Sequence, residues 1–127
     1  MEALRERKDP EEVEHIRSAA DVAQRALERT LPQVRSGMTE LAIAGVLEQS
    51  LRAEGSEGFP FETIVASGPR AALPHARAAD RQLAAGDFLL IDYGAIVGGY
   101  CSDITRTFVI GRASDEQKAF YDIVRGA

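Results

Sequence analysis

The stretch FLLIDYGAIVGGYCSDITRTFVIG, from Phe88 to Gly111, decides the fold. Its two apolar, β-branched segments flank a pair of glycines, which is the pattern of a β-hairpin with a short turn. Each segment also carries one aspartate, Asp92 in the first and Asp103 in the second. Both aspartates fall in the part of the hairpin that the surrounding apolar residues predict to be the most buried.

Two registers of this hairpin are compatible with the glycines. A turn at Val97-Gly98 sets Asp92 directly opposite Asp103, whereas a turn at Gly98-Gly99 sets Asp92 opposite Thr105 with Asp103 on the diagonal. Because side chains alternate along a strand, either register leaves the two carboxylates on the same face of the sheet.

Two like charges this close destabilise a hairpin unless something compensates them. One carboxyl group could be protonated, cations such as Arg106 or Arg81 could pair with them, or both could bind a divalent metal ion. A simpler alternative is that Asp92 caps a turn and Asp103 is a solvated residue at the sheet edge. The spacing alone leaves these alternatives open.

The rest of the chain predicts an α+β fold. A helix is expected after the N-cap Asp9, ending at 35–37, and a second helix after Thr39, with Leu41, Ala44, Leu47 and Leu51 as its buried stripe. A strand is expected over 59–68, and a third helix after Ser114, with its apolar face at Ala119, Phe120, Ile123 and Val124. This order predicts helices packed on one face of an antiparallel sheet.

Composition excludes several classes of function. The 127 residues are 45% hydrophobic with a formal net charge of -5, which disfavours binding to nucleic acid or to an anionic membrane surface. A single cysteine, Cys101, excludes an internal disulfide and is typical of a cytoplasmic protein. No apolar run approaches the roughly 20 residues that span a bilayer.

Several motifs together resemble a known family. FETIVASGPRAALPHA, LAAGDFLLIDYGA and GGYCSDITRTFVIG, with IRSAADVAQRAL and RSGMTELAIAGVLE before them, are similar to the N-terminal half of the pita-bread (M24-type) metallopeptidase domain. The resemblance covers most of the chain from about Arg5 onward. ASGPRAALPHA and YCSDITRT resemble the Xaa-Pro branch, aminopeptidase P and prolidase, more than the methionine aminopeptidases.

The resemblance implies a set of site residues and an activity. Asp92 and Asp103 match metal ligands, the second of them bridging two metal ions; His75 matches the histidine beside the substrate; and Thr105 matches a residue that hydrogen-bonds to a ligand. The implied cofactors are two divalent ions, with manganese favoured and cobalt or zinc as alternatives. The implied substrate is a dipeptide or peptide with proline in second position, cleaved at the Xaa-Pro bond.

The resemblance also implies that residues 1–127 form only the N-terminal half of the catalytic domain. The complete domain is about twice as long, and its C-terminal half supplies a histidine and two glutamate ligands. After Asp103 the sequence contains no histidine and only one glutamate, Glu116. We therefore expect the isolated chain to hold metal poorly, to be inactive, and to associate with the missing half or with itself as a homo-oligomer. The alternative is a non-catalytic binding or scaffold module derived from the same fold.

Overall fold

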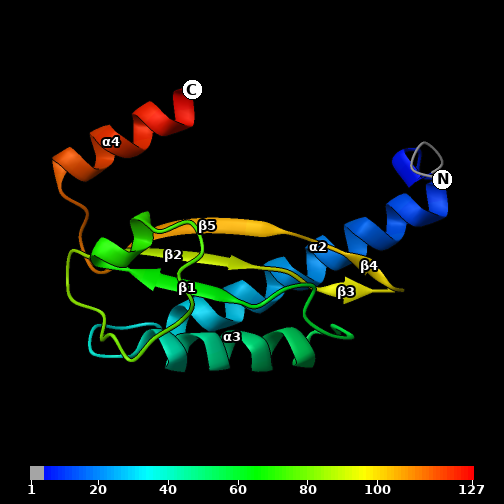
Figure 1. The fold of residues 1–127 in the computed structure, drawn as a ribbon, viewed down its shortest axis with the longest axis horizontal. Helices are drawn as coiled ribbons and strands as arrows, with labels where there is room; N and C mark the ends of the chain where they lie inside the picture. The colour runs from blue at the N-terminus through cyan, green and yellow to red at the C-terminus, as the bar shows by residue number, and fades with distance from the viewer. Residues whose placement is uncertain (1–4) are drawn as a thin grey trace.

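The computed structural model describes residues 5–127 and has the predicted α+β architecture (Figure 1). A three-stranded antiparallel sheet has the order β1-β2-β5. Helices α2 and α3 lie against one face of this sheet, and α4 lies on the opposite side (Figure 1). Among residues 5–127, no helix is long and apolar enough to cross a membrane.

Helix α2 spans Pro10–Thr30 and begins as predicted. The Asp9 side chain accepts from the backbone N–H of Glu12, whose carboxylate accepts from the N–H of Asp9, so both capping-box bonds are formed. The helix ends several residues before the predicted stop at 35–37. Pro32 has no N–H to continue the ladder, and the 3₁₀ turn η1, Leu31–Gln33, replaces it.

Helix α3 spans Glu40–Ala53 and is capped by the Thr39 hydroxyl, which accepts from the N–H of Ala42. Its predicted buried stripe is wrong at one position, because Leu41 is 50% exposed. The helix is rotated so that its buried face comprises Glu40, Ile43, Ala44, Leu47, Ser50 and Leu51.

The sheet is built from β1 (Ile64–Ser67), β2 (Phe88–Tyr93) and β5 (Ile104–Val109). β1 is shorter than the predicted strand 59–68, since it starts later and Gly68, with φ +52°, opens the 3₁₀ turn η2, Gly68–Ala72. The short strands β3 (Ile96–Val97) and β4 (Tyr100–Cys101) extend the hairpin to its tip. There Val97 pairs with Tyr100, so the turn is Gly98-Gly99 and Asp92 lies opposite Thr105.

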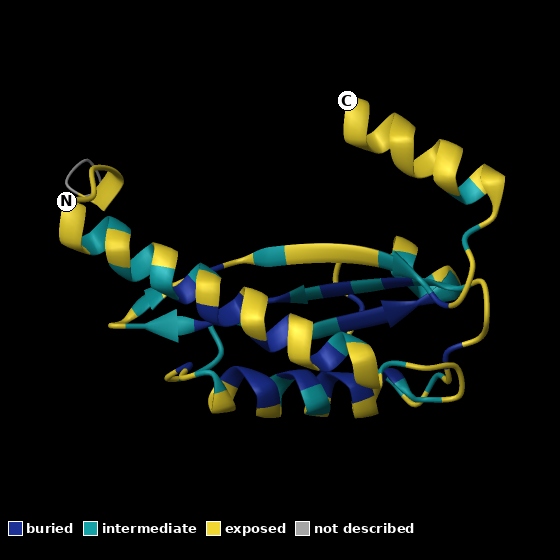
Figure 2. Cartoon of the chain, turned by 180° about the vertical axis from the view of Figure 1, so that it is seen from behind, coloured by how far each residue is buried: buried dark blue, intermediate teal, exposed yellow. Residues whose placement is uncertain are grey.

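The core lies between the sheet and the helices α2 and α3 (Figure 2). Alternate residues of β2 point into it, namely Leu89, Ile91 and Tyr93, all fully buried. The other residues of β2, namely Phe88, Leu90 and Asp92, are half-buried and point to the opposite side of the sheet. We call this side the open face; it also carries Ile64, Thr105 and Thr107. The expectation that both aspartates occupy the most buried part is therefore wrong: Asp92 is half-buried and Asp103 is exposed.

Helix α4, Asp115–Gly126, has the predicted Ser114 capping box with Gln117. Its apolar face stays exposed, with Phe120 61% and Ile123 72% accessible. The Phe120 ring approaches the ring of Phe88 on the open face, with centroids 6.5 Å apart. An apolar pocket of about 390 Å³ separates the rest of α4 from the sheet.

The tip of the hairpin is held by contacts from other segments. The Glu57 carboxylate accepts from the N–H groups of Gly98 and Gly99, both of which have positive φ. The ring of His15 in α2 stacks on Tyr100 with centroids 5.6 Å apart. Gly98 has φ +58°, and a Cβ atom there would lie 2.5 Å from Nδ1 of His15, so any other residue would be strained and would displace the His15 ring.

The buried face of α3 can be tested with two leucines. We expect Leu47→Ala to lower the free energy of unfolding by about 2–5 kcal/mol, because Leu47 is fully buried and its loss leaves a cavity. Leu41→Ala on the same helix should change it by less than about 0.5 kcal/mol. Urea denaturation followed by circular dichroism measures both, and equal losses would contradict the observed rotation of α3.

Candidate active site

Three segments meet at a pocket of about 400 Å³ that holds three of the four predicted site residues, His75, Asp92 and Asp103, while Thr105 lies outside its lining. His75 comes from the loop after η2, Asp92 from β2, and Asp103 from the residue before β5. The remaining lining residues are Phe61, Glu62, Ile64 and Arg77. The structure therefore brings together a histidine and two carboxylates that lie up to 28 positions apart in the sequence.

Asp92 is placed by its register in the sheet. Its neighbours across the strands are Ile64 on one side and Thr105 on the other. The Thr105 hydroxyl donates a hydrogen bond of 2.9 Å to Oδ1 of Asp92. This contact orients the carboxylate, and within residues 5–127 its second oxygen accepts no hydrogen bond from another side chain.

Cation pairing does not explain the two aspartates. The Arg81 guanidinium pairs with Asp87 at 2.7 Å, and that of Arg106 donates to the backbone carbonyl of Thr105. Within the described residues, no ion pair joins a lysine or arginine to Asp92 or Asp103. The suggestion that Arg106 or Arg81 compensates them is therefore wrong, and both carboxyl groups line the pocket without a cationic partner among these residues.

The strand segments that carry the aspartates are joined closely. A Cβ atom at Gly94 would lie 2.0 Å from the carbonyl oxygen of Ser102, so the two backbones can approach only because residue 94 is glycine. The Ser102 hydroxyl accepts from the N–H of Ala95 and donates to the carbonyl of Ala19 in α2. These contacts fix both aspartate-bearing segments to each other and to the core.

His75 is exposed and lies on a loop that the sequence leaves without regular structure. Three side-chain contacts hold this loop, one of them a hydrogen bond from the Arg70 guanidinium to the carbonyl of Arg77. Nε of Arg77 pairs with Glu62 at 3.0 Å, and the fully buried Glu40 accepts from the N–H of Ala79. Sequence reasoning missed Glu40, Glu62 and Arg77. The one available signal was a glutamate in the first turn of a helix, which is too common to single out Glu40.

The donor types fit a divalent metal ion, but their number does not complete a site. Aspartate oxygens are hard ligands that suit manganese, and imidazole suits several of the same ions. Among residues 5–127, however, no group of three or more histidine, cysteine, aspartate or glutamate side chains is close enough to hold an ion.

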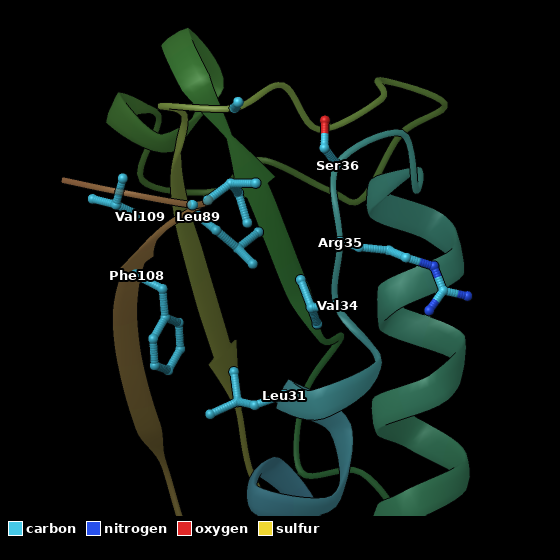
Figure 3. Close-up of a pocket in the computed structure, with 10 residues that line it drawn as sticks. Leu31, Val34, Arg35, Ser36, Leu89, Phe108 and Val109 are labelled. Atoms are coloured by element: carbon cyan, nitrogen blue, oxygen red, sulfur yellow. The ribbon is translucent and has the colours of Figure 1, made fainter.

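A larger pocket elsewhere lacks reactive groups. It has a volume of about 530 Å³ and lies beside η1 and the ends of β2 and β5. Leu31, Val34 and Phe108 border it, while the Arg35 side chain points away (Figure 3). Because no histidine or carboxylate lines this pocket, it has no side chain suited to acid–base catalysis or to metal binding.

Comparison with known proteins identifies the class. The family model described as metallopeptidase family M24 matches residues 14–127, and the chain belongs to this family. It is 41% identical over 124 residues to an uncharacterized peptidase of Bacillus subtilis and 40% identical over 121 residues to the Xaa-Pro dipeptidase of Pyrococcus furiosus. Those matches cover 98% and 95% of this chain but 35% of each relative, so the chain spans about a third of their length.

Solved structures share the fold at high similarity. The X-Pro aminopeptidase of Thermotoga maritima superimposes with a TM-score of 0.94 at 48% identity, over 98% of this chain and 35% of that one. The prolidase of Pyrococcus furiosus gives 0.89 at 39%, over 94% and 35% of the two chains. Aminopeptidase P of Escherichia coli gives 0.88 at 33%, over 94% and 27%. The predicted α+β, pita-bread assignment and the Xaa-Pro branch of the resemblance are confirmed.

The contact at Gly94 yields a test of how the aspartates are placed. We expect Gly94→Ala to lower the free energy of unfolding by about 1–3 kcal/mol, because its methyl group collides with backbone rather than with a flexible side chain. Gly45→Ala in α3 is the matched control. No atom lies within 4 Å of its added methyl group, so it should stabilise the protein by about 0.5–1 kcal/mol. Thermal unfolding separates the two, and a neutral Gly94→Ala would contradict the close approach.

The Arg81–Asp87 pair predicts a pH dependence. The hydrogen bond from Arg81 holds the pKa of the Asp87 carboxyl below its usual value of 3.8. As the pH falls, the Asp87 carboxyl is therefore protonated in the unfolded state before it is protonated in the folded state. The contribution of the Arg81–Asp87 pair to the free energy of unfolding is complete above pH 3.8 and is lost as the pH falls through the lower pKa of the folded state. Asp87→Asn should destabilise the protein near neutral pH, with the difference from the unmodified chain vanishing in strong acid. Urea denaturation across this range measures it, and a difference independent of pH would refute the assignment.

Proposed function

We propose that this chain is the N-terminal half of the catalytic domain of a Xaa-Pro metallopeptidase, which hydrolyses the Xaa-Pro bond of dipeptides or of peptide N-termini. The supporting observation is the pocket that His75, Asp92 and Asp103 line together on the open face. Relatives named Xaa-Pro dipeptidase and X-Pro aminopeptidase, at 40% and 48% identity, support the choice of bond.

Each residue has a role that its position allows. Asp92 and Asp103 present carboxylate oxygens to the pocket as ligands for two divalent ions, of which manganese is favoured and cobalt or zinc are alternatives. Thr105 orients Asp92 through its 2.9 Å hydrogen bond. His75, at the same pocket, donates a hydrogen bond to the substrate carbonyl oxygen as negative charge develops on it. The bound ions supply a water of lowered pKa and polarise the scissile carbonyl.

The proposal requires groups beyond residues 5–127. The two aspartates fall short of a complete ligand set, and the apolar residues of the open face and of α4 remain accessible to solvent. We propose that a C-terminal half, or a second copy of this chain in a homodimer, covers this surface and completes the site. The isolated chain should then be inactive unless it self-associates.

A second candidate is a non-catalytic binding module. The apolar face of α4 and the pocket beneath it favour this alternative, because both are suited to a protein partner. Metal binding distinguishes the two functions, since a module that only binds a partner has no need of the unpaired carboxylates.

Metal binding gives the first test. We expect weak Mn²⁺ binding to the chain, measured by electron paramagnetic resonance, that is abolished by Asp103→Ala. Thr105→Val should weaken it about 10–100-fold by freeing the Asp92 carboxylate. Asp115→Asn, on the exposed start of α4, is the control and should leave binding unchanged. Equal binding by the unmodified chain and Asp103→Ala would remove the basis of the proposal.

Activity gives the second test. With Mn²⁺ added, we expect no release of proline from Ala-Pro by the monomeric chain. Turnover that rises with protein concentration and disappears in Asp103→Ala would show that self-association completes the site. Concentration-independent turnover by a monomer would contradict the half-domain assignment.

A further inference from the structure

Among residues 5–127, Glu40 is the most buried acidic or basic side chain. Its side chain is 0% exposed, and its carboxylate accepts four hydrogen bonds. Oε1 accepts from the N–H and the hydroxyl of Ser67, each at 2.8 Å. Oε2 accepts from Nε of Arg70 and from the N–H of Ala79, each at 3.1 Å.

These donors lie at the two ends of the loop that carries His75. Ser67 is the last residue of β1 and Arg70 lies in η2, whereas Ala79 follows His75 by four positions. One carboxylate therefore joins the beginning of the 68–79 loop to its end. The backbone of α3 adds to this junction, because the N–H of Leu41 donates to the carbonyl of Ala79 at 3.2 Å.

Two other side-chain contacts fix the path of the loop: the Arg70 guanidinium, itself bound by Glu40, donates to the carbonyl of Arg77, and Arg77 pairs with Glu62. Ala76 is its only buried residue, while Leu73 and His75 point to solvent. The Arg77–Glu62 ion pair is largely exposed, with side chains 81% and 60% accessible, and exposed ion pairs contribute little. Buried, charge-assisted hydrogen bonds are stronger and more directional, so Glu40 dominates the placement of the loop.

The chemistry of the junction requires a carboxylate. All four partners are donors, and a carboxylate at a helix N-terminus can accept from all of them while the helix dipole favours its charge. A glutamine has one accepting oxygen and one donating NH₂ group. If its oxygen keeps the two bonds from Ser67, its NH₂ group faces the donors of Arg70 and Ala79, and the far end of the loop is released.

We propose that Glu40 is a positioning residue that fixes His75 at the pocket of Asp92 and Asp103 by joining both ends of the 68–79 loop. The role of His75 rests on the proposed function, whereas the junction itself does not. Glu40 touches neither substrate nor metal and acts through the loop alone.

The test compares Glu40→Gln with Glu54→Gln by NMR of the 127-residue chain. Glu54 is the matched control because it lies at the other end of α3, is paired with Arg25 and Arg29, and does not contact the loop. We expect Glu40→Gln to speed amide exchange at Ala79 about tenfold or more while the Leu47 and Ile91 amides remain protected. Glu54→Gln should leave Ala79 unchanged.

Paramagnetic broadening by Mn²⁺ reports where His75 lies. In the unmodified chain we expect Mn²⁺ to broaden both the Thr105 amide and the His75 ring signals. In Glu40→Gln the broadening of Thr105 should persist and that of His75 should fall, which a general loss of stability would not produce. Rapid exchange at Ala79 in both glutamine variants, or unchanged exchange and broadening in Glu40→Gln, would overturn the proposal.

Failure of the proposed function gives a different result. If Mn²⁺ broadens neither residue in the unmodified chain, the proposal that Asp92 and Asp103 bind metal in this chain fails, and exchange at Ala79 still decides the role of Glu40. If Glu40→Gln does not fold, Arg70→Met takes its place. Arg70 is partly exposed, and its loss removes one bond to Glu40 and one to the carbonyl of Arg77. Faster hydrogen exchange of the amides of residues 77–79 is then expected, and unchanged exchange of these amides overturns the proposal.

Discussion

The pairing of β2 with β5 is the constraint on which the rest of this structure depends. Side chains alternate along a strand, so one register decides both faces of the sheet at once. The register that points Leu89, Ile91 and Tyr93 into the helices also points Asp92 to the open face opposite Thr105. One register of β2 against β5 therefore places both the core residues and the candidate site. If β2 slipped by one residue, its core-facing side chains would move to the open face and Asp92 would move into the core.

Two polar junctions link this sheet to the surrounding segments. In the middle of the hairpin, between β2 and β3, the Ser102 hydroxyl connects Ala95 to Ala19 of α2 beside the close contact at Gly94. At the end of β1, Glu40 and Arg81 both contact Ser67. Both junctions are buried or partly buried, where hydrogen bonds are strong and a missing partner is costly. They hold the segments that carry Asp103 and His75 more firmly than the exposure of those two residues suggests.

The sequence predicts those parts of the fold that depend on neighbouring residues. The caps at Asp9, Thr39 and Ser114 form as expected because each needs only a backbone N–H three positions away. The hairpin and the α+β layout also follow from local patterns. The burial of Glu40 and the exposure of Leu41 do not follow from local patterns. They depend on the hydrogen-bond donors that Ser67, Arg70 and Ala79, far away in the sequence, bring to the first turn of α3.

The candidate site divides in the same way. That Asp92 and Asp103 share a face follows from the alternation of side chains, and both line the same pocket. That His75 joins them could not be derived from spacing, because the path of its loop is set by donors far away in the sequence. The resemblance to a family supplied the histidine, and its role stays a prediction.

The hairpin tip at Gly98-Gly99 has a consequence for protein engineering. Exposed turns are the usual places to insert an affinity tag or a reporter domain, because they tolerate added residues. This turn is bound by Glu57 and covered by His15, and Tyr100 beside it donates to Glu12 at 2.6 Å. An insertion here would disconnect the start of α2 from the sheet, so the exposed residues Gly111 and Arg112, between β5 and α4, are the better site for a fusion.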